Sequence, residues 1–170
     1  MDRDAWNLDP DSVQRALEQL QPASAGMIVR EAFYGTRRFD DFVRHTGLTA
    51  AVVATRLRGL EAAGLLERRA YREPGQRTRQ EYRLTPRGLD LGTALVALLR
   101  WADRWLPAPD GPTVALRHRD CGSPVHVALR CGDGHALADV AEVEAVPGPG
   151  AVALGEVRAR RPAPAPPSGR

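Results

Sequence analysis

The stretch RRFDDFVRHTGLTAAVVATRLRGLEAAGLLERR, residues 37–69, decides the fold of this chain. It contains two short runs with apolar residues at helical spacing, joined at residues 45–48. Gly47 at the junction is the residue type that ends a helix in a left-handed conformation, and Thr49 is a good N-terminal cap for the next helix. The stretch therefore predicts two helices joined by a tight turn.

The second of these helices has two different faces. Val53, Leu57 and Leu60 fall on one stripe, which predicts that Ala51 and Thr55 point outward. Alanine and threonine methyl groups tolerate close approach to base edges, and an arginine beside them can donate to guanine or phosphate. Alanine is also simply a good helix former, so the small outer face by itself leaves both interpretations open.

A basic hairpin follows directly. Residues 65–71 and 80–85 have strand character, and Glu73-Pro74-Gly75-Gln76 between them has the chemistry of a turn. Two helices with a tight turn and then a hairpin match the order of a winged helix-turn-helix, in which the second helix enters the major groove of DNA. We therefore expect an α+β chain, mostly α with a β-hairpin wing, plus a small β-rich C-terminal module.

Positive charge is concentrated in the same region. The chain has no lysine, and residues 37–87 carry twelve arginines against six acidic residues. A local excess of positive charge is the electrostatic footprint of a polyanionic partner, although a solvated basic surface gives the same count. Three arginines near the hairpin tip can reach phosphate: Arg72, Arg77 and Arg79.

Helices are also predicted on both sides of this region. One begins near Pro10-Asp11-Ser12 and a second covers residues 26–33, while Thr85-Pro86 opens a long helix. The long helix carries an apolar stripe at alternating spacings of four and three, which favours a seam with another helix over packing on the chain's own core. With Leu17 of the first helix, the expected dimer interface is Leu17, Leu91, Leu95, Leu98, Ala102 and Trp105.

The C-terminal part contains the cysteines. Strands are predicted at residues 113–117, 125–130 and 140–146, around Cys121 and Cys131. Together with His118 and His135, the two cysteines could hold a structural zinc ion. A metal-free module with two buried or disulfide-linked cysteines is the interpretation that we favour, so no cofactor is expected apart from this candidate zinc.

Several motifs in the chain resemble the HxlR family of bacterial transcriptional regulators. They are RF at residues 38–39, GLLERR at 64–69, EYRLTPRG at 81–88 and WADR at 101–104. The resemblance covers residues 10–106, and the combination is more specific than any single piece. It implies a homodimeric winged helix-turn-helix protein that is dimerised through its terminal helices and binds a palindromic operator.

Two departures from the family pattern stand out. Members often carry a cysteine just before the first helix, which serves in some as a thiol sensor, but residues 9–12 contain none. The tryptophan often found at the start of the second helix is replaced, near Ser24, by a small residue. The first departure argues against sensing by that route.

The resulting domain prediction is a flexible leader at 1–9, the winged helix-turn-helix with its dimerisation helix at 10–106, and a linker at 107–112. The cysteine-containing module follows at 113–150, and residues 151–170 form an Arg/Pro-rich disordered tail. The recognition helix is expected to contact DNA through Thr49, Ala50, Ala51, Ala54, Thr55, Arg56 and Arg58.

The predicted function is that of a sequence-specific regulator, not an enzyme, since no phosphate-binding glycine loop or nucleophile elbow occurs. Its expected partners are double-stranded DNA, a second copy of itself and a small-molecule effector. The chain has no signal or membrane-spanning pattern, so a cytoplasmic location is expected. The alternatives are a metal- or thiol-responsive regulator controlled through the C-terminal Cys/His module, and a protein-interaction module on a winged-helix scaffold.

Overall fold

The computed structural model describes residues 3–7, 11–72 and 78–154. The chain divides into two compact units. One is Ala16–Ala128, and the other combines the described residues of Met1–Arg15 and Leu129–Arg170. None of the described helices is long and apolar enough to cross a membrane.

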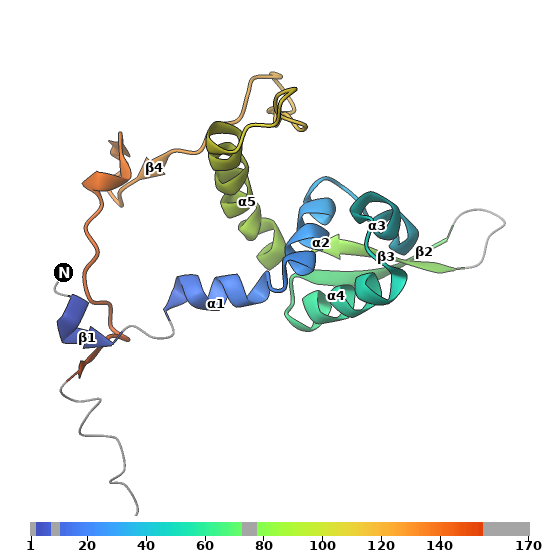
Figure 1. Ribbon diagram of the computed structural model, residues 1–170, viewed down its shortest axis with the longest axis horizontal. Helices are drawn as coiled ribbons and strands as arrows, with labels where there is room; N and C mark the ends of the chain where they lie inside the picture. Colours follow the sequence, from blue (N-terminus) through green and yellow to red (C-terminus); the bar gives the residue numbers. More distant parts are fainter. Residues whose placement is uncertain (1–2, 8–10, 73–77, 155–170) are drawn as a thin grey trace, which may run out of the picture. The chain divides into compact units, whose positions relative to one another are not determined.

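The larger unit is built from helices around one hairpin (Figure 1). Its elements are α1 (Ser12–Gln19), α2 (Ala23–Phe33), α3 (Phe39–Thr46), α4 (Ala50–Ala62), β2 (Leu66–Tyr71), β3 (Arg79–Leu84) and α5 (Pro86–Trp105). α1 begins in the smaller unit's part of the chain and continues into this one. The order of elements confirms the predicted winged helix-turn-helix.

The core of this unit lies where α2, α3 and α4 meet. Ile28 and Val29 of α2, Phe42 of α3, and Val53 and Leu57 of α4 are completely buried. Each complete burial of an aliphatic or aromatic side chain of this size contributes roughly 1.5–3 kcal/mol. Val53 and Leu57 lie on the face that the apolar spacing predicts, and with Phe42 they join the helix-turn-helix to α2.

The hairpin β2–β3 is antiparallel and in register from Leu66 opposite Leu84 to Tyr71 opposite Arg79. Tyr82 of β3 packs edge-on against Phe42, with ring centroids 6.2 Å apart. The backbone N–H of Tyr82 also donates to the carbonyl of Arg37, at 2.8 Å. The wing is thereby fixed to the start of α3, and the predicted turn at 73–76 lies outside the described residues.

Thr85 joins the end of the hairpin to α5. Its hydroxyl donates to the carbonyl of Gly64 at 2.6 Å and accepts from the backbone N–H of Gly88 at 3.1 Å. Gly88 is buried, and a Cβ built on it would lie 2.2 Å from the carbonyl oxygen of Leu65. α5 therefore starts in close backbone contact with the residues that link α4 to β2.

The smaller unit consists of short pieces. They are a 3₁₀ turn at Arg3–Ala5, β1 (Trp6–Asn7), β4 (Leu129–Arg130), β5 (Ala136–Leu137), a 3₁₀ turn at Val140–Glu142 and β6 (Val152–Ala153). β1 pairs with β6, and β4 pairs with β5. The first nine residues were predicted to be a flexible leader and 151–170 a disordered tail, but half-buried Trp6 and Val152 belong to a strand pair between these segments.

The predicted strands of the C-terminal part are only partly present. Residues 113–117 and 125–130 contribute a single bridge, Arg117 opposite Pro124, besides the short β4. The predicted strand at 140–146 is wrong for its first three residues, which form a 3₁₀ turn. The side chains of Asp139 and Glu142 cap this turn reciprocally, which favours a turn over an extended chain.

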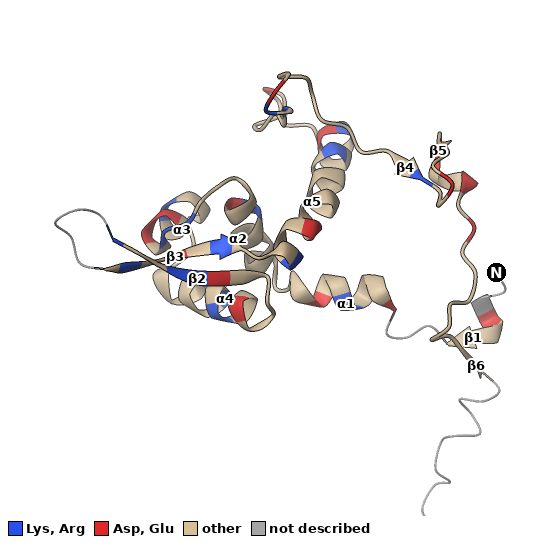
Figure 2. Ribbon diagram, turned by 180° about the vertical axis from the view of Figure 1, so that it is seen from behind, with Lys and Arg blue, Asp and Glu red and all other residues tan. Residues whose placement is uncertain are grey.

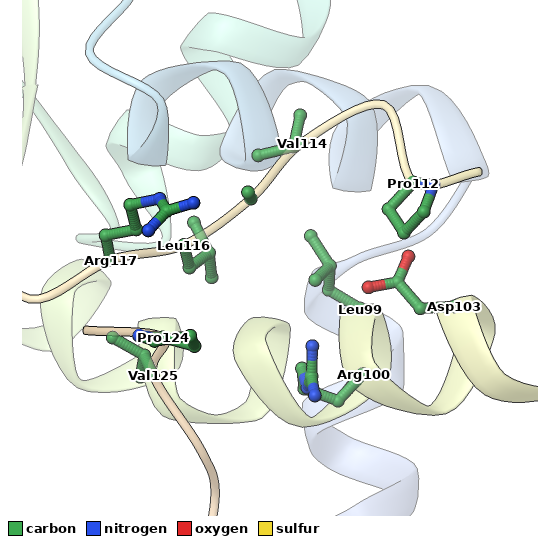
Figure 3. Close-up of a pocket in the computed structure, with 10 residues that line it drawn as sticks. Leu99, Arg100, Asp103, Pro112, Val114, Leu116, Arg117, Pro124 and Val125 are labelled. Atoms are coloured by element: carbon green, nitrogen blue, oxygen red, sulfur yellow. The ribbon is translucent and has the colours of Figure 1, made fainter. Parts of the chain in front are cut away.

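The boundary between units also differs from the predicted linker at 107–112, because the larger unit continues to Ala128. Residues that follow the linker lie against α5. Pro112 and Leu116 line a hollow of about 200 Å³ together with Leu99 and Asp103 of α5 (Figure 3). This packing keeps the start of the predicted module with the winged unit.

Candidate nucleic-acid interface

The turn between α3 and α4 has the two features that the sequence predicts. Gly47 ends α3 in the left-handed conformation, with φ 68°, and Thr49 caps α4. The hydroxyl of Thr49 accepts a hydrogen bond from the backbone N–H of Val52 at 3.4 Å. The hydroxyl of Thr46 closes the end of α3 by donating to the carbonyl of Phe42 at 2.6 Å.

The outer face of α4 is made of small residues and one arginine. Val53, Leu57 and Leu60 are buried, whereas Thr49, Ala50, Ala51, Thr55 and Arg58 are exposed and Ala54 is half-buried. The Thr55 hydroxyl donates to the carbonyl of Ala51 at 2.9 Å, so its hydrogen-bonding capacity is partly used within the helix. A shallow, methyl-lined surface of this kind can approach the floor of a groove closely.

Arg58 extends this surface toward the C-terminal end of α4. It is exposed, and within the described part of the chain it forms no ion pair or hydrogen bond. A guanidinium group with no internal partner keeps all its donors available for phosphate or for a guanine edge. Arg58 is therefore the residue of α4 best placed to recognise a polyanion.

Arg56 has a different environment from the one expected. It was predicted to contact DNA, but its Nε donates to the hydroxyl of Ser24 at 2.9 Å and the residue is half-buried. Ser24 is the position at which the family resemblance leads us to expect tryptophan. Through this hydrogen bond Arg56 ties α4 to α2, and its contact with DNA stays a prediction.

The wing carries the second group of predicted contacts. Arg72 directly follows β2 and Arg79 opens β3, and both are exposed. Arg77 lies outside the described residues. Basic residues occur along the hairpin and on α4 (Figure 2), which matches a surface that follows a phosphate backbone.

Three other arginines of this region are engaged within the chain. Arg68 donates to Glu61 at 2.8 Å, and Arg69 and Arg83 pair with Glu67 and Glu81. The hydrogen bond that Arg68 donates to Glu61 raises the pKa of Arg68. These pairs bring the charge on the two strands of the hairpin close to neutral.

Sequence reasoning missed two arginines beside the wing. The guanidinium carbon of Arg38 lies 5.0 Å from the centre of the Tyr71 ring, and Arg37 is bonded through its carbonyl to Tyr82. Both arginines are exposed at the start of α3. The pair was visible in the sequence, but only the fold brings it next to the hairpin.

The predicted dimer stripe divides into two parts. Leu91 and Leu95 pack against the unit's own core, and Ala102 is half-buried. Leu98 and Trp105 are 55% and 61% exposed, and Trp101, which was not predicted, is 55% exposed. Leu17 of α1 is exposed as well. An apolar surface therefore remains on the second half of α5, and its centre lies at Leu98, Trp101 and Trp105.

The candidate zinc ligands fall into two pairs, one in each unit. The Nδ1 atom of His118 lies 3.3 Å from the sulfur of Cys121, and hydrogen bonds from Ser123 lower the pKa of the Cys121 thiol. Both cysteines are exposed and free, so the favoured interpretation of buried or disulfide-linked cysteines is wrong. Among the described residues, no three potential ligands are grouped where they could hold a metal ion. The joint site of His118, Cys121, Cys131 and His135 stays a prediction.

The fold and this surface define a class, the winged helix-turn-helix transcriptional regulators that bind DNA. The family model described as HxlR-like helix-turn-helix matches residues 24–110. The chain belongs to the HxlR-like helix-turn-helix family.

Relatives and solved structures agree with this assignment. An HTH-type transcriptional regulator of Mycobacterium tuberculosis is 40% identical over 82% of this chain and 87% of its own length. A Synechocystis regulator of the same type is 30% identical over 55% of this chain and 69% of its own.

Among solved structures, the transcription factor PA1607 is similar with a TM-score of 0.70 and 34% identity, over 81% of this chain and 95% of that one. PA1374 of Pseudomonas aeruginosa follows with a TM-score of 0.56 and 32% identity, over 86% and 97%. These matches extend over more of the chain than the family model does, so the similarity includes part of the C-terminal extension.

Proposed function

We propose that this protein regulates transcription as a homodimer that binds a palindromic operator, with one α4 in the major groove of each half-site. The observation that carries the proposal is the outer face of α4, where small residues adjoin Arg58, a side chain that pairs with none of the described residues. A dimer of this class reads half-sites about one helical turn apart. The protein then acts by binding and not by catalysis, in the cytoplasm, where bacterial DNA lies.

Each part of the surface has its own task in this proposal. Ala51 and Thr55 approach base edges, and Arg58 donates to a base or to phosphate. Arg72, Arg77 and Arg79 of the wing hold the flanking backbone, together with Arg38 at the start of α3. Backbone contacts of this kind set position and affinity but carry no sequence information directly.

The dimer uses the exposed part of the predicted stripe. Leu98, Trp101 and Trp105 of α5 expose a large apolar surface to water, which is unfavourable. A second copy of the chain that covers this surface removes it from water. Leu17 of α1 adds to the same interface in the proposal. Leu91 and Leu95 support the fold of each protomer.

Binding to the DNA upstream of the protein's own gene tests the proposal. Affinity is measured against that duplex and a random duplex of equal length, at two salt concentrations. We expect preference for the upstream DNA and a steep loss of affinity with salt, by about 0.9 in logarithmic slope for each phosphate neutralised. Equal, salt-insensitive binding would instead favour a protein-interaction module on this scaffold.

Two substitutions separate base recognition from backbone contact. Arg58→Ala should lower the affinity for the upstream DNA roughly tenfold or more, while Arg79→Ala should weaken both duplexes and reduce the salt slope by about 0.9. Arg119→Ala removes an exposed arginine of the C-terminal extension and is the matched control. Loss of affinity in the control equal to that in Arg58→Ala would show that only net charge matters.

A metal-responsive version of this function is a second candidate, which the contact between His118 and Cys121 favours. Zinc content of the purified protein, with and without Cys121→Ser, tests it directly. Stoichiometric zinc that is lost in the variant would support a structural or sensing site. Absence of zinc in the wild-type protein purified with zinc present would exclude it.

A further inference from the structure

A cavity of about 460 Å³ opens between α2, α5 and the chain that follows α5. Met27 and Phe33 of α2, Leu95 of α5 and Leu116 of the following segment are among its lining residues. Pockets for small organic ligands are typically about 300–1,000 Å³ in volume and mainly apolar. All of the lining belongs to the larger unit, so the cavity does not depend on the placement of the smaller one.

Two glycines shape the walls of this cavity. A Cβ at Gly92 would lie 3.1 Å from the Phe33 ring, so the ring lies directly on the backbone of α5. Gly26 lines the cavity from α2, and a Cβ built there would meet only the carbonyl of Leu20, at 3.7 Å. A larger side chain at Gly26 would therefore fill the cavity without disturbing the helix itself.

Polar groups of both signs line the cavity among the apolar residues. They are the guanidinium of Arg30, the phenol of Tyr34 and the carboxylate of Asp103. Burial raises the pKa of Tyr34, the charge of Arg30 opposes this, and the charges of Glu31 and Asp103 add to it. The phenol is thus within electrostatic reach of both a positive and a negative group, and it can donate and accept hydrogen bonds.

The polar side of the cavity is connected by hydrogen bonds to α3, the first helix of the helix-turn-helix. Arg30 donates to Oε1 of buried Glu31 at 2.8 Å, and Oε2 of Glu31 accepts from the hydroxyl of Thr36 at 3.1 Å. The Thr36 hydroxyl lies 3.0 Å from Nδ1 of His45 near the end of α3. A ligand that moved Arg30 would therefore act on a hydrogen-bonded network that reaches the helix-turn-helix.

We propose that this cavity binds a small effector with an apolar, preferably aromatic, body and one uncharged head group, such as a hydroxyl, that both donates and accepts hydrogen bonds. Opposite charges in one lining favour a neutral dipolar group over either ion. The apolar face of a protein helix would leave the phenol of Tyr34 and the carboxylate of Asp103 unmatched, so the occupant is a small molecule. The adjoining hollow shown in Figure 3 shares Leu99, Asp103 and Leu116 with the cavity and gives room for a substituent.

Binding is tested on the full chain by titration calorimetry with 2-naphthol, with naphthalene as the probe that lacks the head group. We expect one 2-naphthol site per chain, and binding of naphthalene roughly fivefold weaker, as for the loss of one net hydrogen bond. Gly26→Leu should weaken 2-naphthol binding tenfold or more. Ala23→Leu adds the same side chain at an exposed position of α2 and should leave binding unchanged.

Two outcomes overturn the inference. One is the absence of 2-naphthol binding to the wild-type protein, and the other is undiminished binding by Gly26→Leu. If Gly26→Leu does not fold, Leu116→Trp fills the same cavity from the segment after α5 and takes its place. If the wild type binds no probe and sedimentation shows that the cavity-filling variant has a different oligomeric state from the wild type, the cavity is part of a protein interface.

The regulatory role of the effector rests on the proposed function, and a separate measurement tests it. Saturating 2-naphthol should change the affinity for the upstream DNA at least severalfold in the wild type and not in Gly26→Leu. Probe binding without DNA binding would refute the proposed function and leave the site intact. DNA binding without probe binding would refute the site alone, and probe binding with unchanged DNA affinity would refute its regulatory role.

Discussion

Gly88 gives the sharpest test of how the unit is held together. It lies in the first turn of α5, where a Cβ would come 2.2 Å from the carbonyl oxygen of Leu65 and 2.9 Å from Cδ2 of Leu84. The first distance is about 1 Å shorter than an ordinary carbon–oxygen contact. Because the obstacle is backbone and cannot change rotamer, Gly88→Ala must displace the start of α5 from the residues linking α4 to β2.

The expected cost follows from that displacement. Overpacking of a close contact typically costs about 1–3 kcal/mol, and the helix propensity of alanine returns up to about 1 kcal/mol. Because an approach of 2.2 Å to a backbone oxygen places the cost at the upper end of that range, we expect Gly88→Ala to lower the free energy of unfolding by about 2 kcal/mol net. Urea denaturation followed by circular dichroism, with equal m-values for variant and wild type, measures it.

Gly59→Ala is the matched control. Gly59 lies within α4, and a Cβ built on it would meet nothing within 4 Å, so alanine should stabilise by about 0.5–1 kcal/mol. The two variants make the same chemical change in opposite steric surroundings. A Gly88→Ala protein as stable as the wild type would refute the close contact of α5 with Leu65.

Three further predictions concern the cap, the support of α4 and the dimer. Thr85→Val should lose about 0.5–2 kcal/mol of stability, because the hydroxyl that accepts from the N–H of Gly88 and donates to the carbonyl of Gly64 is removed while the shape is retained. An unchanged urea midpoint would contradict it. In a double-mutant cycle, Arg56→Ala and Ser24→Ala should show a coupling of about 0.5–1.5 kcal/mol in stability, and additive effects would exclude the hydrogen bond. Trp101→Glu should shift sedimentation toward the monomer without lowering the stability of the protomer. Leu91→Ala should instead destabilise the fold by about 2–5 kcal/mol. If only Leu91→Ala dissociated the dimer, Leu91 and not Trp101 would belong to the interface.

Much of the winged unit could be predicted because its signals are local. The left-handed Gly47, the cap at Thr49 and the Thr85-Pro86 start of α5 each depend on a few neighbouring residues, and all three are where the sequence indicates. Burial of Val53, Leu57 and Leu60 follows from one helical period. Local chemistry and apolar period agree throughout this region, which is why the fold class was accessible.

The stripe on α5 shows what periodicity cannot provide. A regular apolar repeat identifies the face of a helix that will be covered, but not the partner that covers it. Leu91 and Leu95 lie where α5 passes the unit's own core, and Leu98 and Trp105 lie farther along the helix. The point at which the core ends therefore decides which residues of the repeat are buried within the protomer and which stay exposed, and the sequence does not show where that point lies.

Contacts between segments far apart in the sequence could not be predicted from it either. Arg56 and Ser24 are 32 residues apart, and their hydrogen bond depends on how α4 crosses α2. Strands β1 and β6 contain two residues each and pair between opposite ends of the chain. Segments this short have too little pattern to predict a strand, and their pairing is set by chain topology.

The hydroxyl of Thr85 has a consequence for the spacing of operator half-sites. It donates to the carbonyl of Gly64, just after α4, and accepts from the N–H of Gly88 in the first turn of α5. These two hydrogen bonds restrict changes in the angle between α4 and α5. In the proposed dimer, the distance between the two α4 helices is then set by the angle at which the α5 helices cross. Changes to the α5 contact should move the preferred half-site separation by whole base pairs, while changes to the outer face of α4 should alter the preferred bases at a fixed separation.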